Sequence, residues 1–169
     1  MGVFFNDVCF QMTKDPFASI LKRMQRSGVA EPSGLLGCTP AQIQRLETRY
    51  GVTLPATYRR FLELMGRKSG RLVTHDHLDI QYDYVVKATA GFPKLLDESS
   101  SFTLPADALI ILGRDGDQFH YIRCDHPEDS AVWYVNLDDL KPRQVRKSVV
   151  GWVRSWCQEA EQAIADGYY

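Results

Sequence analysis

A rigid Leu-Pro step between two amphipathic segments constrains the fold of this chain more than any other feature. Residues 45–66 read RLETRYGVTLPATYRRFLELMG. Leu54 stands immediately before Pro55, and the proline ring pushes the preceding residue out of helical geometry. Pro55 fits the start of a new helix, because the N–H group it lacks would have no partner there. Gly51 can take the left-handed conformation that ends a helix. The stretch therefore predicts two helices that meet at an angle.

Each of these two helices has one apolar face. Thr39 is placed to cap the first helix, and Pro40 fits its first turn. The residues at helical spacing are Ile43, Leu46 and Tyr50 in the first helix and Tyr58, Phe61, Leu62 and Met65 in the second. Glu47 and its polar neighbours are expected to face water. The two helices should share one core.

Three further segments favour helix. Asp15 can cap a helix that has Pro16 at its first position and Gly28 as its stop. Residues 78–96 fit a helix or a strand, and we favour the helix. Ser148 can cap a last helix whose apolar face holds Val149, Val153, Trp156, Ala160 and Ala163.

Residues 108–137 change character, since three short runs are rich in Ile, Val, Tyr, Phe and Trp. Asp115-Gly116 is a strong tight-turn signal, and Pro127 with its acidic neighbours marks a second turn. This pattern predicts an antiparallel three-stranded meander with helices before and after it. The fold class is therefore α+β, a central antiparallel sheet packed by N-terminal helices and a C-terminal helix.

Length and composition fit one compact unit. The chain has 169 residues, 44% of them apolar, which is enough to bury a core. We expect a domain over residues 39–166 and an N-terminal segment, residues 1–38, with one helix in the same globule. The longest apolar runs are too short to cross a bilayer, and the first residues lack a basic leader. We expect a cytoplasmic protein whose scattered cysteines (Cys9, Cys38, Cys124 and Cys157) are buried, reduced thiols.

The net charge of −1 hides an asymmetry. Residues 1–74 carry eleven Lys or Arg against five acids, residues 75–140 carry four against thirteen, and residues 141–169 carry five against three. An acidic middle third can steer a basic partner to one surface. The alternative is that these acids simply occupy turns between strands, where Asp is favoured.

Catalytic patterns are weak. His75, Asp76 and His77 could begin a metal site, but a catalytic metal needs three or more converging ligands, and the other histidines are His120 and His126. No nucleophile elbow and no phosphate-binding glycine pattern is present. The basic run at residues 59–71 has no matched aromatic platform, and the isoelectric point near 6.4 disfavours direct nucleic-acid binding. We therefore expect no cofactor, no metal and no catalytic residue.

The helix pair carries a family resemblance. Nine positions stand where the opening signature of the SMI1/KNR4 superfamily, also called SUKH, expects them: Ile43, Leu46, Glu47, Gly51, Leu54, Pro55, Tyr58, Phe61 and Leu62. The likeness continues through Leu104-Pro105, ILGRDGDQFHYI, SAVWYV and the closing helix, so it covers roughly residues 39–164. One departure is MGRKSG after the second helix, where the family commonly has an Asn-Gly-Gly stretch.

This resemblance implies a binding module rather than an enzyme. Bacterial members are mostly thought to be immunity proteins that neutralise toxins, often nucleases, and eukaryotic members act as regulatory or adaptor proteins. Our first hypothesis is an immunity protein that binds a cognate toxin domain with a basic surface. The alternatives are a regulatory adaptor of the same fold and a metal-dependent hydrolase using His75, Asp76 and His77. The candidate partner contacts are Asp115 and Asp117 in the first turn, Asp125, Glu128 and Asp129 in the second, and Trp133 or Tyr134 as an aromatic anchor.

Overall fold

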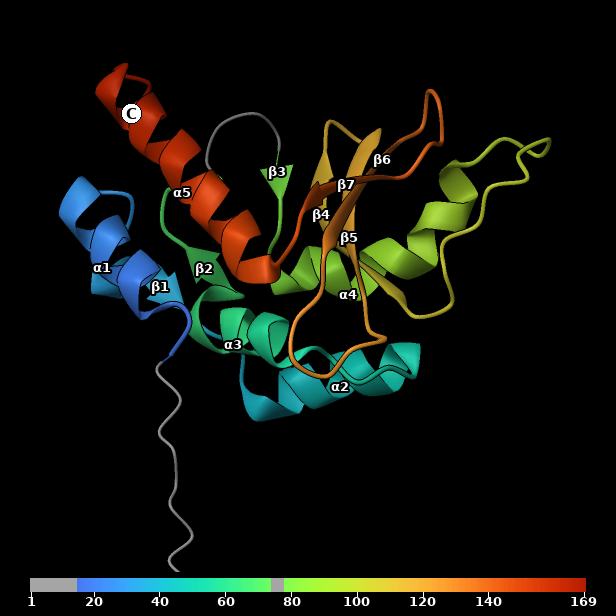
Figure 1. The fold of residues 1–169 in the computed structure, drawn as a ribbon, viewed down its shortest axis with the longest axis horizontal. Helices are drawn as coiled ribbons and strands as arrows, with labels where there is room; N and C mark the ends of the chain where they lie inside the picture. The colour runs from blue at the N-terminus through green and yellow to red at the C-terminus, as the bar shows by residue number, and fades with distance from the viewer. Residues whose placement is uncertain (1–14, 74–77) are drawn as a thin grey trace, which may run out of the picture.

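The structure, a computed structural model, describes residues 15–73 and 78–169 and combines five α-helices with seven strands there (Figure 1). The helices are α1 Ala18–Ser27, α2 Pro40–Tyr50, α3 Ala56–Met65, α4 Tyr82–Gly91 and α5 Val149–Ala165, with 3-10 turns η1 Pro32–Gly34 and η2 Phe92–Leu95. The strands are β1 Leu35–Leu36, β2 Lys68–Ser69, β3 Leu78–Asp79, β4 Ala108–Arg114, β5 Gln118–Arg123, β6 Val132–Asn136 and β7 Arg143–Arg146. This arrangement confirms the predicted α+β class.

A five-stranded antiparallel sheet forms the centre, in the order β3-β4-β5-β6-β7. The predicted meander is its middle, and Arg114 pairs with Gln118 across the first turn. Asp115 and Gly116 both have positive φ, 52° and 84°, as a tight hairpin turn requires. The prediction missed β3 and β7 at the edges. Strand β3 has only two residues and β7 is mostly exposed, so neither shows the apolar alternation that marks a half-buried strand.

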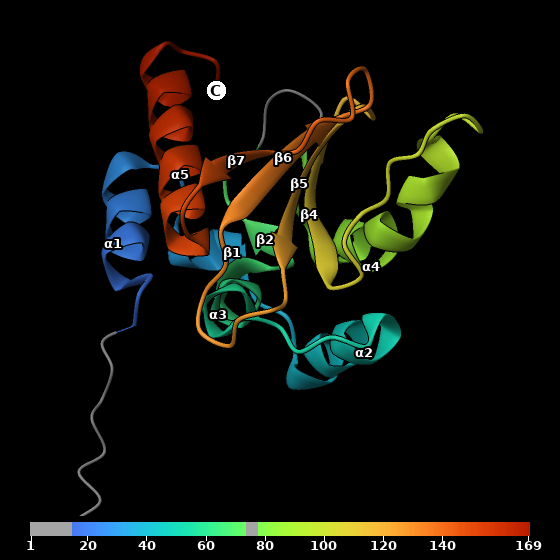
Figure 2. The ribbon, with the colours of Figure 1, turned by 45° about the vertical axis from the view of Figure 1, so that its right-hand side comes forward.

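The sheet separates two hydrophobic clusters. Helices α1, α2, α3 and α5 and the buried residues of α4 pack with Leu109, Ile111 and Ile122 into the larger cluster. On the other face Phe92 of η2 packs with Ile110 and Phe119, beside α4. Figure 2 shows α5 and α4 on opposite sides of the sheet. Residues 108–111 of β4 alternate between the two clusters, as strand geometry dictates, and the register shift between Ile110 and Leu112 places Leu112 with Ile111 in the larger cluster.

The signposted helix ends are confirmed. The Thr39 side chain accepts a hydrogen bond from the backbone N–H of Gln42, and Gly51 ends α2 in the left-handed conformation. The Ser148 side chain accepts from Gly151 N–H at the start of α5. Pro55 is the N-cap of α3, one position before the helix proper.

Two expectations about the helices were wrong. Helix α1 begins at Ala18, after a turn in which the Asp15 carboxylate accepts from the N–H of Phe17, so Pro16 is not its first residue. Glu47 does not face water, because only 8% of its surface is exposed. The ambiguous segment is mainly helical, since α4 and η2 fill residues 82–95 after the short β3.

The structure also shows where the cysteines and the apolar face of α1 lie. Cys38 and Cys157 are buried and Cys124 is half-buried, all three as free thiols, while Cys9 lies outside the described residues. Phe17, Ile20 and Met24 of α1 are buried in the larger cluster. Within residues 15–73 and 78–169, no helix is long and apolar enough to span a membrane.

Candidate functional site

The two acidic turns lie at opposite ends of the sheet. The first, residues 115–117, precedes β5, and the second, residues 124–131, follows it. The two ends of a six-residue strand such as β5 lie roughly 20 Å apart. Both turns were expected to supply one set of candidate contacts, but the meander places them on two separate surfaces. We call them the turn end, with residues 115–117, and the loop end, with residues 124–131.

The loop end is built into the helical layer. Backbone N–H groups of Ala56 and Thr57 donate to the carbonyl oxygens of Pro127 and Glu128, at 2.8 and 3.0 Å. These N–H groups open α3 and have no partner within the helix. The β5–β6 loop therefore caps α3 from outside the helix, and this contact fixes the loop against the Leu-Pro step (Figure 1).

Asp129 has a structural role at the loop end. Its Oδ1 accepts hydrogen bonds from Thr57 Oγ1, Ser130 N–H and Val149 N–H, at 2.7, 2.8 and 3.0 Å. One carboxylate oxygen thus joins α3, the β5–β6 loop and the first turn of α5. Asp125 and Glu128 remain exposed beside it.

Glu47 has a comparable role on the other side of the Leu-Pro step. Its Oε1 accepts from the N–H of Leu54 at 2.8 Å and from Nη2 of Arg59 at 2.5 Å. Pro55 keeps Leu54 out of helical geometry, so the N–H of Leu54 has no partner within a helix. Tyr58 and Phe61 are fully buried and stack at 5.8 Å. The family signature is therefore explained by folding alone.

The turn end is more open. Asp115 is exposed, and its carboxylate lies 3.6 Å from Nε of Arg114. Asp117 is half-buried, and its carbonyl oxygen accepts from the N–H of Leu137 at 2.9 Å. That bond holds the β6–β7 connection beside the β4–β5 turn.

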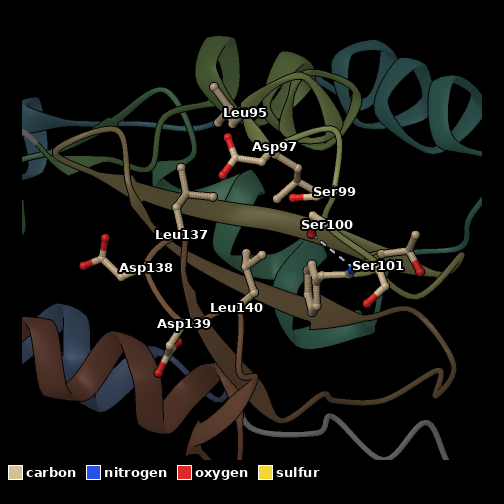
Figure 3. A pocket seen from close by; sticks show the side chains of 12 residues that line it. Leu95, Asp97, Ser99, Ser100, Ser101, Leu137, Asp138, Asp139 and Leu140 are labelled. Atoms are coloured by element: carbon tan, nitrogen blue, oxygen red, sulfur yellow. Dashed lines mark hydrogen bonds between the residues drawn. The ribbon is translucent and has the colours of Figure 1, made fainter.

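A hollow of about 900 Å³ lies at the turn end, between the segment after η2 and the β6–β7 connection. Three lining residues are acidic and none is Lys or Arg. The lining residues are Leu95, Leu96, Asp97, Ser99, Ser100, Ser101, Phe102, Thr103, Leu137, Asp138, Asp139 and Leu140. Figure 3 shows Leu137 and Leu140 on one wall, facing Asp97 and the serines on the other. We call this feature the acidic hollow.

The three carboxylates of the acidic hollow differ in their surroundings. Asp139 accepts from the backbone N–H of Lys141 and pairs with Arg143, and both interactions hold the pKa of Asp139 below its usual value. Asp97 and Asp138 are exposed. Asp97 and Asp138 are therefore the carboxylates most available to a partner.

No sequence pattern indicated this hollow. Its acids occur in DESSS and NLDD, about 40 residues apart, and each stretch alone resembles an ordinary polar loop. Only the pairing of β4, β5 and β6 brings the two loops together. The acidic composition of the middle third was the one available signal.

Trp133 and Tyr134 are both half-buried and point to opposite faces of the sheet. Trp133 stacks on Tyr121 and packs against the smaller cluster, which also includes Leu137 and Leu140 of the hollow. Tyr134 packs edge-on against His120 below α5. Trp133 is therefore on the face that carries the acidic hollow.

The metal site proposed from the histidine pair falls outside the part of the chain that the structure describes. His75, Asp76 and His77 lie outside the described residues. Among residues 15–73 and 78–169, no group of three His, Cys, Asp or Glu side chains could hold a metal ion. His120 Nδ1 accepts a hydrogen bond from Trp152 Nε1 at 2.9 Å. Burial, with the charges of Arg146 and Arg114, lowers the pKa of His120 to about 4.

Comparison with known families fits this architecture. The sequence profile of the SMI1 / KNR4 family (SUKH-1) matches residues 37–155, which is more than half of the chain. The chain belongs to this family. The match begins just before α2 and ends within α5, so it includes the Leu-Pro step, the whole five-stranded sheet and the acidic hollow. No curated protein matches the chain in sequence.

Proposed function

We propose that this SMI1/KNR4 family member is a non-enzymatic protein-binding module, and specifically a cytoplasmic immunity protein that binds and neutralises a toxin domain with a basic surface. The acidic hollow carries the proposal. At the turn end it presents the exposed carboxylates of Asp97 and Asp138, no Lys or Arg lines it, and Asp115 stands on the adjoining turn.

Electrostatics suggests the class of toxin. Nucleases use Lys and Arg to hold phosphates, so their active sites are cationic. An acidic surface of complementary shape competes with the nucleic acid for those cations and speeds the encounter between the two proteins. At the loop end, hydrogen bonds from the β5–β6 loop and Asp129 hold the fold together. The turn end is therefore the better candidate for the partner surface.

Co-expression tests the proposal directly. A toxin encoded beside this gene should arrest growth when expressed alone, and the full chain should restore growth and form a tight complex with it. No rescue by the folded chain would overturn the proposal. A partner that binds without any toxic activity would favour the regulatory adaptor instead.

Paired variants locate the contact. Asp97→Asn combined with Asp138→Asn removes two charges from the acidic hollow and should weaken the complex by about tenfold or more. Asp125→Asn combined with Glu128→Gln removes two exposed charges from the loop end and should leave affinity within about twofold. A larger loss of affinity from the loop-end pair than from the acidic-hollow pair would place the partner at the loop end.

A further inference from the structure

An apolar groove of about 520 Å³ runs between α4 and the β4–β5 turn. Four of its residues follow one another at helical spacing along α4 and η2, namely Tyr84, Ala88, Gly91 and Leu95. Phe119 forms the floor, and Asp83, Lys87 and Gly116 complete the lining. Helical stripes of this kind normally face a core, and this one faces an opening.

The floor of the groove is rigid, and its rim is open. Phe119 is 4% exposed and packs edge-on against Phe92 with ring centroids 5.1 Å apart. Leu95 at the end of the groove is 48% exposed, one of the most exposed large apolar side chains in the described chain. A side-chain carbon added at Gly91 would meet no atom within 4 Å. The groove is therefore preformed space that the folded chain does not fill.

The groove is continuous with the acidic hollow. Leu95 lines both, and Gly116 of the groove belongs to the same turn as Asp115. Asp83 and Lys87 are the charged residues in the groove lining, while Asp97 lines the adjoining acidic hollow and Asp115 is the chain neighbour of Gly116. Charge complementarity selects a basic partner surface, and the apolar floor selects a projecting apolar side chain from it.

We propose that this groove receives one aromatic or large aliphatic side chain of a basic protein partner, while the carboxylates around it pair with that partner's Lys and Arg residues. The inference rests on the proposed function, because it takes the toxin domain as the natural occupant. Such an anchor in a desolvated pocket commonly supplies most of the affinity of an interface.

Defined peptides test the groove without the toxin. The probe is a capped pentapeptide with one Trp between two pairs of Lys, titrated into the isotopically labelled full chain and followed by amide chemical shifts. We expect shifts at α4 and residues 115–119. Replacing the Trp by Ala, or the four Lys by Glu, should weaken binding by at least about tenfold.

A matched pair of substitutions localises the effect. Gly91→Phe fills the groove from a residue with helical φ and ψ (−80° and −27°), so it should abolish the shifts without unfolding the chain. Ala90→Phe adds the same bulk at an exposed neighbour outside the groove lining and should preserve them. Thermal unfolding of both variants verifies that they are folded.

The outcomes separate this inference from the proposed function. Shifts that survive Gly91→Phe, or equal binding of the Ala peptide, would overturn the groove as an anchor site. A toxin that is neutralised equally well by Gly91→Phe would also overturn it, although the immunity function would then stand. Absence of any toxin rescue would overturn the function, while the peptide result would still decide the groove.

Discussion

Two neighbouring carboxylates, Glu128 and Asp129, show how differently adjacent residues act in this protein. Asp129→Ala leaves the N–H groups of Ser130 and Val149 without their acceptor, and we expect it to lower the free energy of unfolding by about 2–4 kcal/mol. Glu128→Ala removes an exposed side chain and should change the free energy of unfolding by less than about 0.5 kcal/mol. Urea unfolding of both variants measures the difference, and equal effects would contradict the structural role of Asp129.

His120 makes the stability depend on pH. Its pKa is lowered to about 4 in the folded protein, from about 6.5 in an unfolded chain. A lowered histidine pKa means that the unfolded state binds the proton more readily than the folded state. The contribution of neutral His120 to the free energy of unfolding is therefore complete above pH 6.5 and is lost as the pH falls toward 4.

The expected loss between pH 7 and 4.5 is about 2–3 kcal/mol from His120. Urea unfolding at the two pH values measures it, with His120→Gln as the test variant, because an amide can still accept from Trp152 without titrating. His126→Gln, at an exposed histidine, should retain the wild-type pH dependence. If His120→Gln shows the same pH dependence as the wild type, His120 is not the group responsible.

At the scale of elements, helix α4 depends on a glycine in β4. A side-chain carbon at Gly113 would lie 1.9 Å from the hydroxyl oxygen of Tyr84, so the Tyr84 ring occupies the space that the missing side chain leaves. Gly113→Ala should cost about 1–3 kcal/mol through this clash. In a Tyr84→Ala background the same substitution should cost much less, which a double-mutant cycle of unfolding free energies detects. Additive effects would show that the two residues do not compete for space.

The elements also show where sequence patterns succeed. Helices α2 and α5 carry local signals, a capping side chain followed by an apolar stripe, and both were predicted from residue order. Strand β3 depends on Gly113 and Arg114, which are distant in the chain, and the burial of Glu47 depends on the path of the chain after α2. Glu47 looks like a solvated position on α2 until the Leu-Pro step folds back and presents the N–H of Leu54.

At the scale of the whole molecule, three acids of the acidic middle third, Asp97, Asp138 and Asp139, gather at the acidic hollow. We expect the association rate with the proposed toxin partner to fall by about tenfold or more between 50 and 500 mM salt, because exposed charges are screened. Stopped-flow mixing measures it. The Asp97→Asn and Asp138→Asn pair should flatten this salt dependence, and the Asp125→Asn and Glu128→Gln pair should not. A rate that is insensitive to salt would contradict electrostatic steering.

Residue order alone predicted the class of fold, the capped starts of α2 and α5, the first hairpin turn and the family signature, because each leaves a pattern among residues close together in the chain. Tertiary structure decided which acids act together. An antiparallel meander sends alternate turns to opposite ends, so Asp115 and Asp125 lie apart, while Asp97 and Asp138, about 40 residues apart in the chain, line one hollow. Such proximity arises from strand pairing, which no local pattern encodes.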